Sequence, residues 1–301
     1  MRNIHTLILT AAFLMSGLAA SAQSFTIHTK SGEAVTYESA DVDSIVFHDT
    51  ATPDVAAPRI GDIYYNDGTW STTLKTDATP IGVVFCVGIA SDYNDRVAYY
   101  TQKDGSTPLD DFHGYVVALK DATCAEDGSN DGVWWSAFDS SFEGTGASTS
   151  TADFLGYTNT QSIVATAVRD KGSLTPQTNN YPAAYYATTG YEAVCPAPEK
   201  SSGWFMPSAG QLSYIYNRVY FDEDSSGRSC LANTFAALGE DVAAPMYTTD
   251  SSYWTSTEKI DSYGTSTWAY YYCFDSSMFN PGFIADYRKN SEMRVRSVLA
   301  F

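Results

Sequence analysis

The clearest helical pattern in the sequence follows Ser208. Its apolar residues recur at the spacing of one buried helix face, at Leu212, Ile215, Tyr216 and Val219. Ser208 and Gln211 stand three residues apart, which is the spacing of a capping box in which each side chain bonds the other residue's backbone N–H. The pattern therefore predicts a helix that begins at Ser208 and packs one face against a core.

Strand patterns lie on both sides of this helix. The segments Ile81–Ile89 and Gly114–Leu119 are apolar almost throughout, which is typical of central strands. Asp67 and Gly68 lie between two short apolar runs and predict a hairpin turn. Aromatic and β-branched residues predict later strands, read as hairpins, over Tyr253–Glu258, Thr267–Asp275, Phe279–Tyr287 and Met293–Phe301.

Further helices are predicted between these strands. Thr158 to Asp170 has helical spacing, with a second potential capping box at Thr158 and Gln161 and a stop at Gly172. Two shorter helical segments are expected, one at Tyr181–Tyr186 and one that contains Leu231, Phe235 and Leu238 and ends at Gly239. The fold class is therefore α+β, with one large domain over residues 60–301.

The first residues predict a signal peptide over residues 1–22. Arg2 supplies the positive start, Leu7–Leu18 the short apolar run, and Ala20-Ser21-Ala22 the small residues before cleavage. Gln23, and not a cysteine, would follow the cut, so no lipoprotein anchor is expected. The mature chain is thus expected to be exported to the cell surface or the extracellular space, with the periplasm as an alternative.

A short β module is predicted over residues 23–50, followed by a proline-containing linker over 51–59. The module has a strand, a turn around Lys30 and Gly32, a second strand and then Asp41-x-Asp43-Ser44-Ile45-x-Phe47. This layout resembles the short leader module at the start of many exported proteins of Gram-negative gut anaerobes. It is too short to bury a core of its own.

The charge of the chain limits its partners. There are 17 Lys and Arg residues against 35 Asp and Glu residues, a formal net charge of −18. Nucleic acid and anionic membrane surfaces would repel such a chain, whereas neutral or cationic partners would not. No later segment approaches the ~18 consecutive apolar residues of a membrane helix, so no membrane insertion is expected. The 22 tyrosines suit contacts with sugars or proteins.

Five cysteines are present, and export permits disulfides, but an odd number leaves at least one thiol unpaired. Cys86 and Cys273 lie in strand patterns and are expected to be small buried residues. No CxxC pair occurs, which argues against a zinc or thioredoxin-type site.

Several segments together carry a family resemblance. They are Gly61-Asp62-Ile63-Tyr64-Tyr65, Gly114-Tyr115-Val116-Val117-Ala118-Leu119, Gly203-Trp204-Phe205-Met206-Pro207-Ser208-Ala209-Gly210-Gln211-Leu212, Tyr253-Trp254-Thr255-Ser256-Thr257-Glu258 and Val295-Arg296-Ser297-Val298-Leu299-Ala300-Phe301. In this order they resemble bacterial surface domains with a C-type-lectin-like fold, such as the C-terminal domain of collagen-like adhesins and related fimbrial-tip and retroelement-diversified proteins. The resemblance covers most of the mature chain, and Leu299 stands where that family often has a second arginine.

The resemblance implies two main helices packed on small antiparallel sheets, with the N- and C-terminal strands paired. It also implies ligand binding rather than catalysis. Animal C-type lectins bind sugars through calcium with Glu-Pro-Asn and Trp-Asn-Asp sequences, and neither sequence occurs in this chain.

Two acidic loops place oxygen-bearing side chains before a glycine, as half of a calcium site would. Their candidate calcium ligands are Asp127, Asp131, Asp222 and Asp224. The position where an EF-hand loop has its bidentate glutamate holds Phe138 in one loop and Asn233 in the other. Solvated turns are the simpler interpretation, and no other cofactor is expected.

Catalytic motifs are missing from the sequence. His113 is the one histidine of the large domain, in a polar turn with Asp110 and Asp111, and no G-x-S-x-G, H-E-x-x-H or P-loop motif occurs. A carboxylate pair such as Asp250 and Glu258 could in principle cleave glycosides. We expect no enzymatic activity and assign no catalytic residue.

The late aromatic segment is the best candidate for a binding site. Trp268, Tyr270, Tyr272 and Phe274 alternate with Ala269, Tyr271 and Cys273, so they lie on opposite faces of a strand. The small residues suit the interior, which predicts that Trp268, Tyr270 and Tyr272 face outward. The predicted ligand-binding residues are Tyr263, Trp268, Tyr270, Tyr272, Asp275, Phe279, Asn280 and Tyr287. The opposing interpretation is that half of these aromatic residues belong to the core.

Together these features predict an exported, non-catalytic binding protein, an adhesin or recognition module for a host or microbial glycan or surface protein. A structural component of a fimbria or envelope assembly is the alternative. An enzyme related to the formylglycine-generating enzymes, which share the fold class, is a third possibility, but Cys230 and Cys273 lie in no matching pattern.

Overall fold

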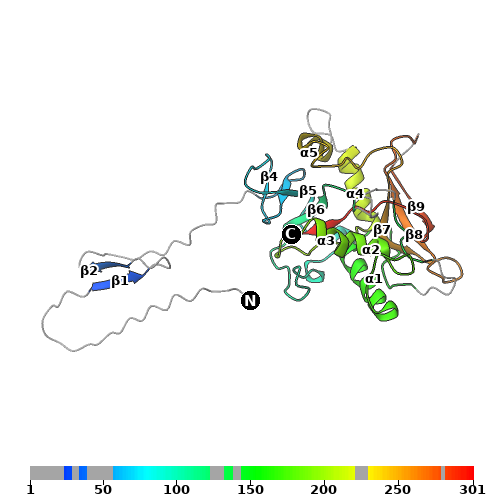
Figure 1. Cartoon of the computed structure of the whole chain (residues 1–301), viewed down its shortest axis with the longest axis horizontal. Helices are drawn as coiled ribbons and strands as arrows, with labels where there is room; N and C mark the ends of the chain where they lie inside the picture. Colours follow the sequence, from blue (N-terminus) through cyan, green and yellow to red (C-terminus); the bar gives the residue numbers. More distant parts are fainter. Residues whose placement is uncertain are drawn as a thin grey trace. The chain divides into compact units, whose positions relative to one another are not determined.

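The computed structural model describes residues 24–28, 34–38, 57–122, 132–137, 144–220, 230–278 and 282–301; the side chains of 25, 27, 28 and 218–220 are excepted. The chain divides into two units, Met1–Val55 and Ala56–Phe301 (Figure 1). The predicted signal peptide lies outside the described residues. The predicted short β module falls in the first unit and the predicted lectin-like domain in the second.

The described residues of the first unit form an antiparallel pair of strands, β1 (Ser24–His28) and β2 (Ala34–Glu38). The hydroxyls of Thr26 and Thr36 lie 2.7 Å apart across the two strands. All of β2 is exposed, including Val35. Strand β2 therefore buries none of its side chains, as the short length of the module predicts.

The core of the second unit is a five-stranded antiparallel sheet in the order β10-β6-β5-β3-β4. Its strands are β3 (Ile63–Tyr65), β4 (Trp70–Ser71), β5 (Pro80–Val87), β6 (Gly114–Ala118) and β10 (Val298–Ala300). The sheet confirms the hairpin turn at Asp67 and Gly68 and the two apolar central strands.

Both faces of this sheet are covered, which explains why its central strands are apolar throughout. Val83 and Phe85 of β5 join one apolar cluster with α4 (Ala209–Tyr220) and α5 (Cys230–Leu238). Ile81 and Val84 join a second cluster with α1 (Gly156–Lys171) and α2 (Pro182–Tyr185). A strand with an apolar cluster on each side cannot alternate between polar and apolar residues.

The remaining helical elements are short. They are two 3-10 turns, η2 (Ser91–Tyr93) and η3 (Val97–Tyr99), the π turn η4 (Tyr186–Gly190) and α3 (Tyr191–Val194). The described chain is thus α+β with antiparallel sheets. No helix among its described residues is long and apolar enough to cross a membrane.

The predicted capping box at the start of α4 is confirmed. The backbone N–H of Ser208 donates to Gln211 Oε1 at 2.9 Å, and the N–H of Gln211 donates to Ser208 Oγ at 3.2 Å. Leu212, Ile215 and Tyr216 form the buried face. The side chain of the fourth predicted residue of this face, at position 219, lies outside the described ones.

The second predicted capping box is wrong. Helix α1 begins at Gly156, so Thr158 already lies inside the helix, and its hydroxyl donates to the Leu155 carbonyl at 3.1 Å. The predicted end is confirmed, because Gly172 ends the helix in the left-handed conformation, with φ at 80°.

Packing against α4 accounts for this earlier start. A Cβ atom on Gly156 would lie 2.9 Å from the Ser208 nitrogen and 3.0 Å from the Met206 carbonyl oxygen. A Cβ atom on Gly210 would lie 2.8 Å from the Ala152 carbonyl oxygen. Only hydrogen fits at these two positions, so the starts of α1 and α4 are in direct contact.

A second sheet has three antiparallel strands, β7 (Ser252–Lys259), β8 (Trp268–Cys273) and β9 (Phe283–Arg288), with β8 in the middle. The predicted strand over Met293–Phe301 does not continue this sheet as a hairpin; only its end forms a strand, β10, which pairs with β6 of the five-stranded sheet. The strand pairing implied by the resemblance also differs, since β10 lies beside β6 and not beside the first strand, β3.

Candidate functional site

The exposed end of the three-stranded sheet is the candidate site. We define the β8–β9 surface as Lys259, Tyr263, Trp268, Tyr270, Asp286, Tyr287 and Arg288 (strands at the right of Figure 1). The pairing register places five of these residues on one face: Trp268 lies opposite both Lys259 and Arg288, and Tyr270 lies opposite Asp286. Tyr287 lies opposite Ala269, and Tyr263 belongs to the loop between β7 and β8. Residues opposite each other in adjacent strands share a face of the sheet.

Two half-exposed rings lie at the centre of this surface, each with a cation near it. The Arg288 guanidinium carbon lies 5.9 Å from the centre of the Trp268 ring, and Lys259 Nζ lies 5.7 Å from the centre of the Tyr270 ring. These distances are within the range of cation–π contact. The surface therefore combines flat rings with groups that can bond hydroxyls or carboxylates.

Lys259 also forms an ion pair with Asp286, with Nζ 2.7 Å from Oδ1. This hydrogen bond raises the pKa of Lys259 above its usual value, so the amine is fully charged at neutral pH. Both side chains keep about a third of their area exposed, at 35% and 31%. The pair is thus open to competition from a ligand.

Tyr263 projects from the loop between β7 and β8 and is 90% exposed. Asp261 holds this loop, because its carboxylate accepts from the N–H groups of Tyr263 and Thr265, both at 2.9 Å, and from the Thr265 hydroxyl at 2.6 Å. The bonds from Thr265, foremost that of its hydroxyl, lower the pKa of Asp261. The loop presents a large ring in a backbone that is already ordered.

Of the predicted residues, Trp268 and Tyr270 share one face of the sheet, Tyr287 contacts the Trp268 ring, and Tyr263 lies in the loop that precedes β8. The rings of Trp268 and Tyr287 lie 6.3 Å apart in an edge-to-face arrangement. The opposite face of the sheet is also partly open, since Tyr271 is half-buried and packs 6.5 Å from the exposed Phe283.

The prediction that Tyr272 faces outward is wrong. Tyr272 is 3% exposed, and Tyr216 of α4 covers it with ring centres 5.4 Å apart. Phe274 is also fully buried against Tyr216. Helix α4 therefore covers one half of the strand face that the alternation places outward, and leaves the half around Trp268 open.

Asp275 is buried as well, and its carboxylate accepts from the N–H of Ser277 at 2.8 Å and from its hydroxyl at 2.7 Å. These bonds order a turn and direct the carboxylate into the chain. Two further predicted ligand-binding residues, Phe279 and Asn280, lie outside the described residues.

The predicted calcium ligands Asp127, Asp131, Asp222 and Asp224 also lie outside the described residues. Within the part of the chain that the structure describes, no three His, Cys, Asp or Glu side chains come together as a metal site would require.

Groups that could support catalysis lie in separate environments. His113 Nε2 lies 3.5 Å from Asp111, whose side chain is almost fully exposed, and the His113 ring packs 4.9 Å from that of Trp70. Asp250 is exposed, whereas Glu258 is buried.

The structure describes four cysteines, Cys86, Cys195, Cys230 and Cys273. Cys86 and Cys273 are buried in strands as predicted. Burial raises the pKa of the Cys195 thiol to about 11, which disfavours the reactive thiolate at neutral pH.

Sequence reasoning found the rings of this surface but missed Lys259, Asp286 and Arg288. Each lies on a different strand from its partner: Lys259 contacts the Tyr270 ring, Arg288 contacts the Trp268 ring, and Asp286 pairs with Lys259. A pairing register for β7, β8 and β9 would have been needed to find them, and the loops between these strands do not fix it.

Comparison with known proteins gives one similar fold. No protein-family model matches the sequence, and no curated protein does. The structure is similar to the crystal structure of a fimbrial protein from Bacteroides ovatus, with a TM-score of 0.52 and 19% sequence identity over 93% of this chain. The chain spans 57% of the length of that protein. The two proteins thus share a fold.

Proposed function

We propose that this protein is an exported binding protein of the bacterial surface whose larger unit adopts a C-type-lectin-like fold and recognises a glycan or surface protein without catalysis. The exposed ring cluster of the β8–β9 surface carries the proposal. The similarity in fold to a fimbrial protein supports a surface role.

The chemistry of the cluster suits recognition. Trp268 and Tyr270 offer rings that can stack on the C–H faces of a sugar or on a partner's apolar side chains, and Tyr263 adds a third ring from an ordered loop. Rigid aromatic side chains give contact area at a low entropic cost. Lys259 and Asp286 lie beside the rings and can exchange their mutual bond for bonds to hydroxyl groups.

A glycan array with the purified full-length chain tests this proposal. We expect binding that is lost in Trp268→Ala and reduced at least tenfold in Tyr263→Ala, because each substitution removes an exposed ring. Tyr99→Ala is the matched control, since Tyr99 is an exposed tyrosine outside this sheet. A glycan signal that is equally strong in wild type and Trp268→Ala would refute a site at the β8–β9 surface.

Assembly into a fimbria or envelope structure is the second candidate, and the outer edge of β9 supports it. Lys289 N–H donates to the Thr267 carbonyl. In an antiparallel pair every second residue bonds the neighbouring strand, so the odd-numbered residues of β9 bond β8. The backbone N–H and C=O groups of residues 284 and 286 therefore point away from β8. Among the described residues no backbone partner lies on that side of Ile284 or Asp286. Such an edge can accept a strand from another subunit.

Replacing Ile284 with proline separates the two candidates, because it removes an edge N–H while leaving the rings in place. If the protein is an assembly component, polymer formation by the full-length chain should fail in Ile284→Pro and persist in Trp268→Ala. If it is a recognition module, glycan binding should be lost in Trp268→Ala and persist in Ile284→Pro.

A further inference from the structure

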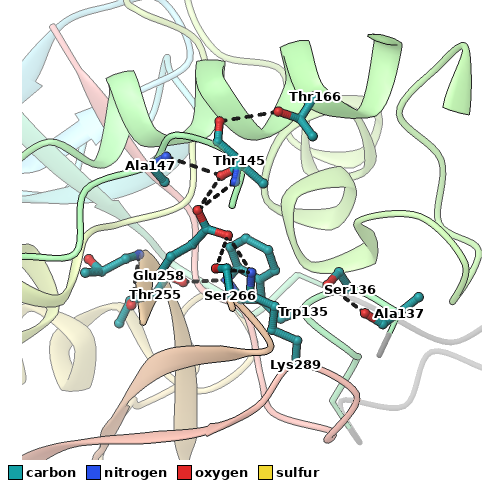
Figure 2. Close-up of polar contacts among 11 residues, drawn as sticks. Trp135, Ser136, Ala137, Thr145, Ala147, Thr166, Thr255, Glu258, Ser266 and Lys289 are labelled. Carbon is teal, nitrogen blue, oxygen red and sulfur yellow. Dashed lines mark hydrogen bonds and ion pairs between the residues drawn. The ribbon is translucent and has the colours of Figure 1, made fainter. Parts of the chain in front are cut away.

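A buried lysine and a buried glutamate meet within the three-stranded sheet. Lys289 directly follows β9 and Glu258 lies near the end of β7; their side chains are 1% and 2% exposed. Lys289 Nζ contacts Glu258 Oε1 directly (Figure 2). The ring of Trp135 lies 4.1 Å from Nζ. The amine and the carboxylate are thus held together in an environment with almost no solvent.

The two oxygens of Glu258 are held differently. Oε2 accepts from the backbone N–H of Thr145 at 2.9 Å and from its hydroxyl at 2.8 Å. Oε1 contacts the amine and accepts from the Ser266 hydroxyl at 2.9 Å. The Ser266 oxygen in turn accepts from Lys289 Nζ at 3.1 Å. Ser266 therefore connects the amine with the oxygen that the amine contacts (Figure 2).

Burial also changes the acid–base balance of the amine. Loss of hydration lowers the pKa of Lys289 to about 8, even though Glu258 opposes this shift. The uncharged amine is consequently within reach at neutral pH. The direct contact of Nζ with Oε1 gives one proton a path between them, and its transfer leaves a lone pair on the nitrogen that faces the carboxyl group.

We propose that Lys289 and Glu258 condense to an intramolecular amide bond. The Nζ lone pair attacks Cδ of the protonated carboxyl group, and the negative charge that develops on Oε2 is stabilised by the two donors of Thr145, as in an oxyanion hole. Ser266 passes a proton from nitrogen to Oε1. The Cδ–Oε1 bond then breaks, Oε1 leaves as water, and the carbonyl bond to Oε2 forms again.

This step needs no co-reactant. One amine and one carboxylic acid give one amide and one water molecule, with no change in oxidation state. Holding the two groups in contact removes the entropic cost of bringing them together. The product would join β7 covalently to the residue after β9, so that the two outer strands of the sheet remain linked even when the hydrogen bonds of β8 are broken.

A second lysine–carboxylate pair in the same sheet provides an internal control. Lys259 and Asp286 are also in contact, at 2.7 Å, but both are partly exposed. Water can solvate their charges, and the described contacts place no pair of donors on one Asp286 oxygen as Thr145 does for Glu258. We therefore expect no condensation at Lys259.

Mass spectrometry of the full-length wild-type protein tests the proposal. Tryptic digestion should yield a branched product that joins the peptide containing Glu258 to the peptide containing Lys289, with a mass one water molecule below the sum of the two. Trypsin should not cleave after Lys289, because the acylated side chain no longer carries a charge. Trypsin should cleave normally after Lys259. Cleavage after Lys289 with an unmodified Glu258 peptide would overturn the proposal.

Two variants extend the test. Ser266→Ala keeps both reacting groups and should reduce the fraction of branched product at least tenfold at a matched time after synthesis, whereas Ser277→Ala, a substitution outside this cluster, should leave it unchanged. An equal yield in both would overturn the role of Ser266 in proton transfer. The wild-type digest decides whether the bond forms, even if a Lys289 variant fails to fold.

Discussion

The sheet formed by β7, β8 and β9 contains two lysine–carboxylate pairs that differ mainly in their access to water. Lys259 and Asp286 are 35% and 31% exposed, whereas Lys289 and Glu258 are 1% and 2% exposed. Exposed pairs contribute about 0–1 kcal/mol to stability, while breaking a buried pair costs about 3–5 kcal/mol. One pair can therefore exchange partners with a ligand, and the other holds the sheet together.

The pKa values of the two lysines change in opposite directions for the same reason. At Lys259 the hydrogen bond that the amine donates to Asp286 outweighs the small loss of hydration and raises the pKa. At Lys289 the loss of hydration outweighs the attraction of Glu258 and lowers the pKa to about 8. Solvent access, more than the partner, thus decides which protonation state each lysine favours.

The largest effect is expected from removing one partner of the buried pair. Compared with a chain in which the amide bond has not formed, Lys289→Ala leaves the Glu258 carboxylate buried without its cation and should lower the free energy of unfolding by about 3–5 kcal/mol. Urea denaturation of the full-length chain measures this change, and Lys259→Ala is the control, with an expected loss of at most about 1 kcal/mol. Equal losses of unfolding free energy in the two variants would show that burial does not make the Lys289–Glu258 pair contribute more to stability than the Lys259–Asp286 pair.

A smaller change in stability is expected from pH, and the contributions of Lys289 and Lys259 should change in opposite directions. In a chain without the amide bond, Lys289 has a folded pKa of about 8, against 10.5 for an ordinary lysine. The unfolded chain then binds more protons between these values, so stability should rise as the pH increases through this window. The raised pKa of Lys259 acts oppositely: its contribution is full below the unfolded pKa and is lost as the pH rises through the folded one.

Urea midpoints measured from pH 8 to 10.5 for wild type, Lys289→Met and Lys259→Met check this prediction. The difference between wild type and Lys289→Met should increase with pH if the amine is free and stay constant if the amide bond has formed. A difference that falls with pH would contradict the lowered pKa of Lys289.

The smallest effect is expected from salt. Raising the ionic strength from ~0.01 M to ~1 M shortens the Debye length from about 30 Å to about 3 Å. The stability difference between wild type and Lys259→Ala should then disappear, whereas the difference between wild type and Lys289→Ala should persist. Chemical denaturation with urea, which adds no ions, measures both stability differences. A difference between wild type and Lys289→Ala that also disappears at high salt would contradict the prediction.

Local sequence signals predicted one helix start and failed at the other. At Ser208 and Gln211 the spacing alone gave the correct capping box, because both bonds lie within four residues. Thr158 and Gln161 have the same spacing, but α1 starts earlier, where Gly156 packs against the start of α4. A contact with a segment far along the chain thus overrode a local preference.

At the candidate site, too, sequence patterns within one strand gave correct predictions, whereas features that depend on other segments were missed. Alternation along β8 correctly placed Trp268 and Tyr270 on the open part of the sheet, since alternation is a property of one strand. Tyr272 has the same alternation and is nevertheless buried, because α4 covers that end of the strand. Lys259 and Asp286 were missed because their positions depend on the register between strands.

The contact between Gly156 and the start of α4 has a consequence for motion. With no side chain between them, α1 and α4 have little space to slide past each other, so a displacement of one helix is transmitted to the other. Since α4 also supports the packed half of β8 through Tyr216, both helices and this strand are expected to move as one rigid body. Any adaptation to a bound partner would then be confined to side chains and to the loop that presents Tyr263.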